Sequence, residues 1–329
     1  LYRQPGGRSC RPHFHSIHTE IQEVIILKEL YPLKGGITTV ITPFHGEKKE
    51  IDIDCLKAEI ETAIQGKVAG FLVPCVASEI PYLSFDEKLK MVKAVSEVAN
   101  GRAKVITSIS SDIPEERIKL MKQFLDYGCT GINIALNYTD RDTFLRDIEM
   151  IDKEKPPFLI MQDVDFGGPG IPDEVLIEAF ENYETVIGTK VEVQYSGMKY
   201  TRLLKATQGR MNISSGWGND QLIELLDRGV HAIMPSGLFS FWAKVYELHA
   251  SGKREQAKKL FYDMLPVISF TRQDQALNRS FHKRLLKKMG IFKTIDSRET
   301  VVFDEYHKAY ADELMERAIH IMDHLSDYE

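Results

Sequence analysis

The chain has 329 residues, of which 43% are hydrophobic and 27% are charged, and its formal net charge is −6. This composition excludes a mainly disordered protein. The longest strongly apolar stretch, residues 68–77, is about half of the roughly 20 residues that a spanning helix needs, which excludes a membrane protein. Lys and Arg are dispersed among Asp and Glu, so no broad basic face is expected and nucleic acid is excluded as the main partner.

Residues 1–18 differ in composition from the rest of the chain. They contain three arginines and no acidic residue, which is typical of an organellar presequence, but two prolines and two glycines disfavour the amphipathic helix that such a segment forms. A targeting segment and a flexible extension both stay open. We expect residues 1–34 to be an N-terminal extension that is partly flexible.

From Gly35 onward, short apolar β-rich runs alternate with amphipathic helical segments. Eight runs predict strands, at residues 37–44, 69–75, 104–110, 131–136, 157–163, 186–192, 211–216 and 230–236. Helices are expected between them, at residues 51–65, 84–100, 114–127, 140–153, 173–183, 198–208, 220–227 and 239–251. The second helix begins with a capping box at Ser84 and Glu87. Intervening helices imply parallel strands, and several runs are continuously apolar, as strands covered on both faces are.

Eight strand–helix units over about 220 residues favour an α/β fold of the (β/α)8 TIM-barrel type over an open doubly wound sheet, because no GxGxxG motif follows the first strand. After residue 251 the alternation stops, and three helices are expected at 253–270, 274–289 and 304–327. We therefore predict the extension at 1–34, the barrel at 35–252, and a C-terminal helical domain at 253–329 that packs on the barrel.

The cysteine and histidine patterns favour neither a disulfide framework nor a metal site. The four cysteines lie far apart without a CxxC pair, so a reducing, cytoplasmic compartment is expected. His45 and His231 fit structural roles better than acid–base roles. No group of His, Cys, Asp or Glu has metal-ligand spacing, so we expect no metal and no cofactor.

Lys190 is the main candidate for chemistry, because it ends the sixth predicted strand and active sites of such barrels lie at the C-terminal strand ends. Burial among apolar residues favours the neutral amine. A neutral amine attacks a ketone to form a Schiff base, whose iminium serves as an electron sink for bond breaking at the neighbouring carbon. The alternative is a structural ion pair with Glu192, which lies two residues along on the same face of the strand.

The order of these motifs, over residues 35–324, resembles the dihydrodipicolinate synthase and N-acetylneuraminate lyase family. The resemblance rests on GGITTVITPF at 35–44, on CVASE at 75–79, where the family has Gly-Thr-Thr-Gly-Glu, and on IGTK at 187–190. It implies a (β/α)8 barrel with C-terminal helices, class I Schiff-base chemistry, and Lys190 as the Schiff-base former.

Two departures from the family pattern affect the second and fifth strands. The threonines whose hydroxyl relays protons in the family are absent, so the backbone around Ala77 and the hydroxyl of Ser78 are candidates for holding a substrate carboxylate; a solvated turn serine is the alternative for Ser78. Glu79 is expected to orient this loop. Gln162 stands where synthases and aldolases have a catalytic tyrosine, and its amide suits substrate orientation. Alternation along the strand should turn Asp163 away from Gln162.

Further candidates follow from the same resemblance. Tyr138 falls where the family has a tyrosine that often reaches the active site of a neighbouring subunit, so it is a candidate proton relay, with interface packing as the alternative. Ile233 and Ser236 lie where the family offers a backbone carbonyl and small residues to the substrate, although the Ile233 side chain suits the core. Glu192 is the candidate base for a C3 proton, with an ion pair to Lys190 as the alternative.

Ser78-Glu79, Gln162-Asp163, Lys190-Val191-Glu192 and Gly216-Trp217-Gly218 are together similar to the branch of the family that dehydrates 2-keto-3-deoxy sugar acids. The resemblance implies a cofactor-independent lyase for a small-molecule 2-oxo acid, a dehydratase or aldolase, working as a homodimer or homotetramer. The arginine that synthases carry after the fifth strand is missing from residues 163–170. A condensing enzyme like dihydrodipicolinate synthase with an altered proton relay, and a barrel that binds a 2-oxo acid without turnover, are the alternatives.

Overall fold

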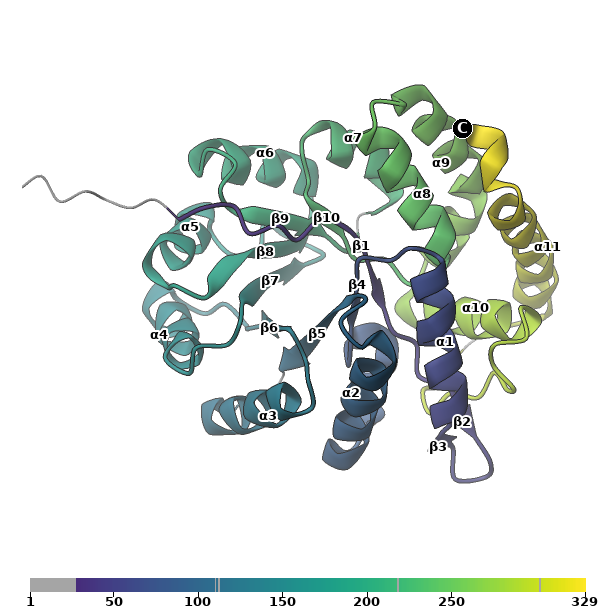
Figure 1. Cartoon of the computed structure of the whole chain (residues 1–329), viewed down its shortest axis with the longest axis horizontal. Helices are drawn as coiled ribbons and strands as arrows, with labels where there is room; N and C mark the ends of the chain where they lie inside the picture. The colour runs from purple at the N-terminus through teal and green to yellow at the C-terminus, as the bar shows by residue number, and fades with distance from the viewer. Residues whose placement is uncertain (1–27, 110, 112, 218, 302) are drawn as a thin grey trace, which may run out of the picture.

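A closed barrel of parallel strands forms the centre of the protein (Figure 1). The computed structural model describes residues 28–329 except residues 110, 112, 218 and 302. Around the barrel, β1 pairs with β4 on one side and with β10 on the other, and the remaining strands follow in chain order between them. Within the described residues the barrel strands number eight, as predicted: β1 Gly35–Thr39, β4 Gly70–Leu72, β5 Lys104–Ile109, β6 Gly131–Ala135, β7 Leu159–Asp165, β8 Val186–Val193, β9 Asn212–Ser215 and β10 Ala232–Ile233.

The helices that connect the strands cover the outside of the barrel (Figure 1). The predicted capping box at the start of α2 is confirmed: the Ser84 hydroxyl accepts from Glu87 N at 3.3 Å, and the Glu87 carboxylate accepts from Ser84 N at 2.9 Å. These connecting helices are α1 Ile53–Gln65, α2 Phe85–Ala99, α3 Pro114–Asp126, α4 Arg141–Asp152, α5 Asp173–Asn182, α6 Ser196–Ala206, α7 Leu222–Asp227 and α8 Phe239–Ala250.

The first predicted strand is shorter than expected. It ends at Thr39, and a small antiparallel hairpin of β2 Phe44–His45 and β3 Glu50–Ile51 precedes α1, which begins only after its N-cap Asp52. Phe44 at the end of the apolar run pairs with Ile51 in this hairpin and is buried in the hydrophobic core of the barrel. The cations of Lys283 and Arg298, from the C-terminal part of the chain, lie over its ring at 4.6 Å.

Three C-terminal helices, α9 Arg254–Thr271, α10 Gln275–Lys288 and α11 Glu305–Asp323, pack together beside α8 (Figure 1). They share one hydrophobic core with α7 and α8, which includes Phe241 and Trp242 of α8, Phe261 of α9 and Phe281 of α10. The C-terminal helices are therefore held against the barrel by a common core, although the exact division at residue 252 stays a prediction. No helix in the described ranges is long and apolar enough to cross a membrane.

Residues 28–34 lie against the first residues of β8 and β9, at the end of the barrel where the strands begin. The Asn212 amide donates to Tyr31 O and Leu33 O at 3.1 and 2.8 Å, and Lys28 Nζ donates to three carbonyls at the end of α5 and the start of β8. The proposed targeting or flexible segment at residues 1–18 lies outside the described residues.

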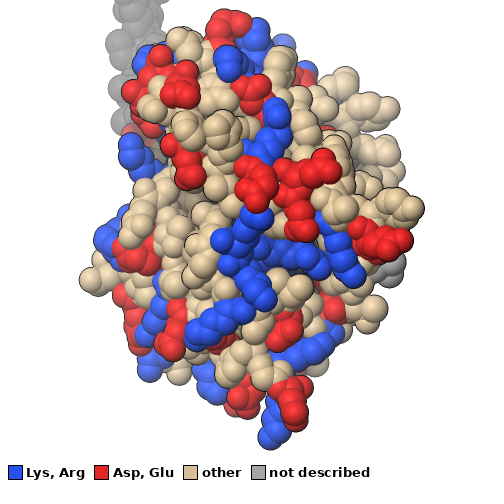
Figure 2. Space-filling model, turned by 90° about the vertical axis from the view of Figure 1, so that its right-hand side faces the viewer, with Lys and Arg blue, Asp and Glu red and all other residues tan. Residues whose placement is uncertain are grey.

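The surface carries both signs of charge in close alternation. On the face that presents the C-terminal helices, Lys and Arg side chains lie directly beside Asp and Glu side chains (Figure 2). One such pair is Lys288 of α10 with Glu316 of α11, at 2.6 Å. This mixing agrees with the dispersed charges of the sequence.

Candidate functional site

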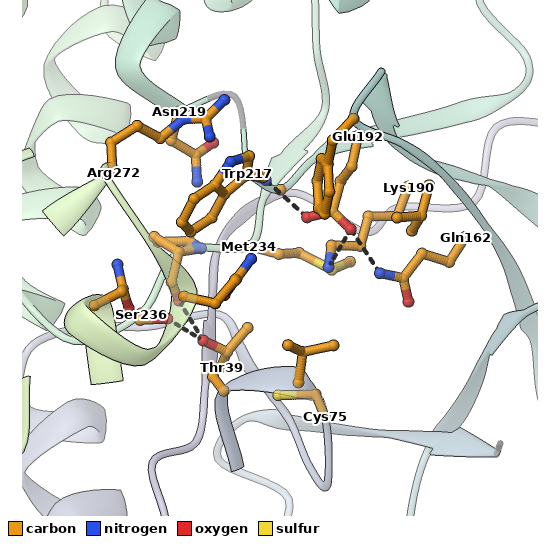
Figure 3. A pocket seen from close by; sticks show the side chains of 18 of the residues that line it. Thr39, Cys75, Gln162, Lys190, Glu192, Trp217, Asn219, Met234, Ser236 and Arg272 are labelled. Atoms are coloured by element: carbon orange, nitrogen blue, oxygen red, sulfur yellow. Dashed lines mark hydrogen bonds and ion pairs between the residues drawn. The ribbon is translucent and has the colours of Figure 1, made fainter. Parts of the chain in front are cut away.

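A cavity of about 390 Å³ lies at the C-terminal ends of the barrel strands (Figure 3). Its walls come from the strand ends and the loops that follow them, and from α9 and α10, which cover one side. The barrel contributes residues that include Thr39, Cys75, Ala77, Ser108, Gln162, Lys190, Glu192, Gly216, Trp217, Met234 and Ser236. The C-terminal helices and their caps contribute Ile268, Thr271, Arg272, Gln275, Asn278 and His282.

Lys190 and Glu192 lie together in this cavity. Both belong to β8 and point to the same side, as their spacing of two residues predicts. Lys190 Nζ lies 3.1 Å from Glu192 Oε2, and only 6% and 9% of the two side chains are exposed. The amine and the carboxylate are therefore close enough to exchange a proton directly.

A network of hydrogen bonds holds the Glu192 carboxylate toward Lys190. Glu192 Oε2 accepts from Gln162 Nε2 at 2.6 Å, and Glu192 Oε1 accepts from the backbone N–H of Trp217 at 2.7 Å (Figure 3). Gln162 is held in turn by Asn133 of β6, whose amide donates to Gln162 Oε1 at 2.7 Å. These hydrogen bonds fix the orientation of the Glu192 side chain beside Lys190.

Gly216 makes room for this pair. A Cβ atom at position 216 would lie 2.1 Å from Glu192 Oε1 and 2.6 Å from Lys190 Cε, far inside van der Waals contact. The close approach of the chain after β9 requires a glycine here. It also brings the N–H of Trp217 within reach of Glu192.

The opposite wall is the short 3₁₀ turn η1 Val76–Ser78, which follows β4. Cys75 and Ala77 line the cavity, and burial raises the pKa of the Cys75 thiol, which therefore stays protonated at neutral pH. Nearby, the hydroxyls of Thr39 and Ser236 hydrogen-bond each other at 2.7 Å (Figure 3). This wall offers neutral donors, while the Lys190 wall carries the charges.

Three of the predicted site residues do not line this cavity. Ser78 is fully buried, and its hydroxyl donates to Val40 O at 2.6 Å and accepts from Cys75 N at 3.2 Å, so it shapes the turn. Tyr138 is half-buried beside Phe144, with ring centroids 6.0 Å apart. The Ile233 side chain is fully buried in the core shared with the C-terminal helices. The Ser78 hydroxyl thus bonds within the protein, and its role in holding a substrate carboxylate stays a prediction.

Two neighbouring acids serve the scaffold, as expected. Asp163 points away from Gln162 to the outside of the barrel, where its carboxylate lies 2.5 Å from Lys199 Nζ of α6. Glu79 binds Lys283 Nζ of α10 at 2.5 Å and accepts from the N–H groups of Arg298 and Glu299 at 2.8 and 3.0 Å. Glu79 thus ties the loop after β4 to the C-terminal segment.

The sequence did not single out Asn133 or Arg272. Asn133 is a buried amide in a strand, a residue type that is unusual in an apolar core and that signals a polar partner. Arg272 follows α9, which comes after the last of the alternating strand–helix units in the sequence. The residues around Arg272 give no sign that it lies near the barrel's strand ends.

Comparison with known proteins adds to this geometry. Residues 32–316 match the model of the dihydrodipicolinate synthetase family. This chain belongs to that family. It is accordingly an enzyme, a lyase of the Schiff-base type.

Among its relatives, the 4-hydroxy-tetrahydrodipicolinate synthase of Methanocaldococcus jannaschii is 24% identical over 246 residues, which cover 71% of this chain and 82% of that protein. The enzyme of the same name from Sorangium cellulosum is 36% identical over 108 residues, only 32% of this chain and 36% of that protein.

Solved structures share the fold. The 4-hydroxy-tetrahydrodipicolinate synthase of Methylacidiphilum fumariolicum SolV has a TM-score of 0.81 at 19% identity, covering 90% of this chain and 99% of that chain. N-acetylneuraminate lyase from Fusobacterium nucleatum has a TM-score of 0.78 at 20% identity, covering 87% of this chain and 99% of that chain.

Proposed function

We propose that this enzyme dehydrates a 2-keto-3-deoxy sugar acid through a Schiff base on Lys190. The observation that carries the proposal is the pairing of the Lys190 amine with the Glu192 carboxylate at 3.1 Å, inside a cavity where Gln162 supports the carboxylate. An amine can pass its proton to an adjacent carboxylate and, as the free amine, attack a ketone.

The chemistry begins with attack of Lys190 Nζ on the C2 ketone, and loss of the ketone oxygen as water leaves an iminium. The iminium acidifies the C3 proton, which Glu192 removes to give an enamine. The C4 hydroxyl then departs as water with the proton returned by Glu192, and the electron pair of the enamine forms the C3–C4 double bond. Hydrolysis of the unsaturated imine frees Lys190 and releases the dehydrated 2-oxo acid.

The C1 carboxylate of the substrate fits the opposite wall. Ala77 and the thiol of Cys75 line the cavity there, and the Thr39 and Ser236 hydroxyls lie close by. Neutral backbone and side-chain donors hold a carboxylate without competing with Lys190 for charge. We assign Ala77, through its backbone, and Ser236 to substrate binding, and any part played by Ile233 to its backbone carbonyl.

The loop after β7 favours dehydration over condensation with an acidic aldehyde. Its only charged residue in the segment 164–171 is Asp165, whose carboxylate accepts from Gly167 N at 3.2 Å and from Gly170 N at 3.1 Å. No cation stands there to bind the carboxylate of an aldehyde substrate. The condensing activity named for the relatives therefore lacks a binding group in this loop.

The test is a product assay with 2-keto-3-deoxypentonate, comparing the wild type with Glu192→Gln. Dehydration gives 5-hydroxy-2-oxopent-3-enoate, which isomerises to 2-oxoglutarate semialdehyde as the C5 and hydroxyl protons leave and C3 and C4 are protonated, whereas cleavage of the C3–C4 bond gives pyruvate. We expect the semialdehyde from the wild type, and loss of C3 proton exchange with deuterated water in the variant. Pyruvate as the main product would overturn the proposal in favour of aldol cleavage.

We further propose that the enzyme is a cytoplasmic homodimer or homotetramer. Tyr138, half-buried outside its own chain's cavity, then stays a predicted proton relay for a neighbouring copy. Light scattering of the purified protein gives the oligomeric state, and a monomer with full activity would remove this role from Tyr138.

A further inference from the structure

Building on the proposed function, we propose that Arg272 binds a second carboxylate at the far end of the substrate, so that the enzyme prefers 2-keto-3-deoxy sugar diacids, and 2-oxo diacids in general, to monoacids such as 2-keto-3-deoxypentonate. Arg272 is the residue that follows α9, and it lines the same cavity as Lys190. It lies at the side of the cavity that the C-terminal helices cover.

Stacking on Trp217 fixes the position of Arg272. The guanidinium carbon lies 4.3 Å from the centroid of the Trp217 ring. Figure 3 shows Trp217 between Arg272 and Glu192, and the Trp217 N–H is the donor that holds Glu192. The cation is thus tied through one residue to the catalytic pair, which sets it at a defined place relative to the Schiff base.

Among the residues that the structure describes, the Arg272 guanidinium has few polar partners. Within that set its Nε atom is buried without a hydrogen bond, and its nearest carboxylate is Asp220, at 3.6 Å from Nε. By contrast, Arg279 of α10 makes a two-point contact with Glu299, at 2.7 and 2.6 Å. Burial also lowers the pKa of Arg272, and the negative charges of Asp220 and Glu192 oppose this shift only in part.

A carboxylate suits this position better than other groups. A guanidinium presents N–H donors in a planar fork that matches the two oxygens of a carboxylate. Asp220 already places one negative charge beside Arg272, which disfavours a doubly charged phosphate. The surrounding Gln275 and Asn278 side chains are neutral and can bind the hydroxyls between the two acid groups.

The experiment compares two six-carbon 2-oxo acids that need no turnover: 2-oxoadipate, a diacid, and 2-oxohexanoate, a monoacid. Each is titrated against the protein, the Schiff base is reduced with borohydride, and the adduct is quantified by intact mass. We expect 2-oxoadipate to half-saturate the wild type at a concentration about 10- to 100-fold lower, the range that a charge-assisted contact supplies. In Arg272→Gln this preference disappears.

Arg254→Gln is the matched control, because Arg254 begins the same helix but pairs with Asp227 away from the cavity. It should keep the wild-type preference, and Arg272→Lys should keep part of it. Equal half-saturation by the two acids in the wild type, or an unchanged preference in Arg272→Gln, would overturn the assignment. Absence of any pyruvate adduct in the wild type would instead overturn the proposed Schiff-base function itself.

Discussion

Gly216→Ala is the substitution whose effect on catalysis follows most directly from the structure. The added methyl group would lie 2.1 Å from Glu192 Oε1 and 2.6 Å from Lys190 Cε, whereas ordinary van der Waals contacts are 3.4–4 Å. Both catalytic side chains must therefore move, and Glu192 must move by more than 1 Å or the loop after β9 must withdraw. Either movement separates Glu192 from Lys190 or from the Trp217 N–H.

The expected loss is large but local. A misplacement of about 1 Å in a catalytic group costs about 100-fold in rate, which corresponds to about 3 kcal/mol of transition-state stabilisation. The assay is the rate of borohydride-trapped adduct formation with pyruvate, followed by intact mass. A thermal melt recorded on the same sample shows whether the variant is folded.

Gly167→Ala is the matched control for this prediction. Gly167 lies in the loop after β7, near the same cavity, and a Cβ atom there meets nothing within 4 Å. The control should trap pyruvate at the wild-type rate. If folded Gly216→Ala traps within about threefold of the wild type, the close packing of Lys190 and Glu192 against Gly216 does not matter for catalysis, and the reasoning fails.

Three further predictions concern charged groups. Glu192→Gln should lower turnover of a 2-keto-3-deoxy acid by about 100- to 10,000-fold, the range for loss of a general base, and a rate near wild type would remove Glu192 from proton transfer. Burial lowers the pKa of His282 from 6.5 to about 4, so its contribution to stability is present above pH 6.5 and is lost as the pH falls to 4. The free energy of unfolding, measured with urea, should fall by about 3 kcal/mol between pH 6.5 and pH 4, and the fall should be smaller in His282→Leu. The same pH dependence in both proteins would show that His282 does not cause it. Burial raises the pKa of Glu59 from 4.5 to about 8, so the folded state keeps Glu59 protonated over that range. The contribution of Glu59 to the free energy of unfolding is therefore fully present below pH 4.5 and is lost as the pH rises to 8. Relative to the wild type, Glu59→Gln should therefore gain stability between pH 5 and pH 8, by as much as about 5 kcal/mol, and no gain would indicate that Glu59 is ionised in the fold.

The barrel was predictable because hydrophobic residues recur with a different spacing in its strands and in its helices. Continuous apolar runs mark strands that are covered on both faces, and a capping box such as Ser84 with Glu87 marks where a helix begins. The hairpin after β1 was missed because Phe44 belongs to an apolar run that continues the first strand, whereas its contacts include Lys283 and Arg298, more than 200 residues away. Local patterns carry no information on such contacts.

The same limit explains which site residues were found. Lys190 and Glu192 are two residues apart in one strand, so their shared face follows from alternation alone. Asn133 supports Gln162 only through the pairing of β6 with β7, and Arg272 reaches the cavity only because α9 packs against the barrel. The Ser78 hydroxyl donates to Val40 O, 38 residues away in the chain, and the sequence around Ser78 does not reveal such a contact.

The most direct test of this account is borohydride reduction of the wild-type protein with pyruvate, followed by peptide mapping of the modified residue. The account predicts one adduct, located on Lys190, and no adduct in Lys190→Ala that is folded by its thermal melt. A folded wild-type protein that forms no adduct, or one whose adduct lies on another lysine such as Lys283 or Lys199, would contradict it.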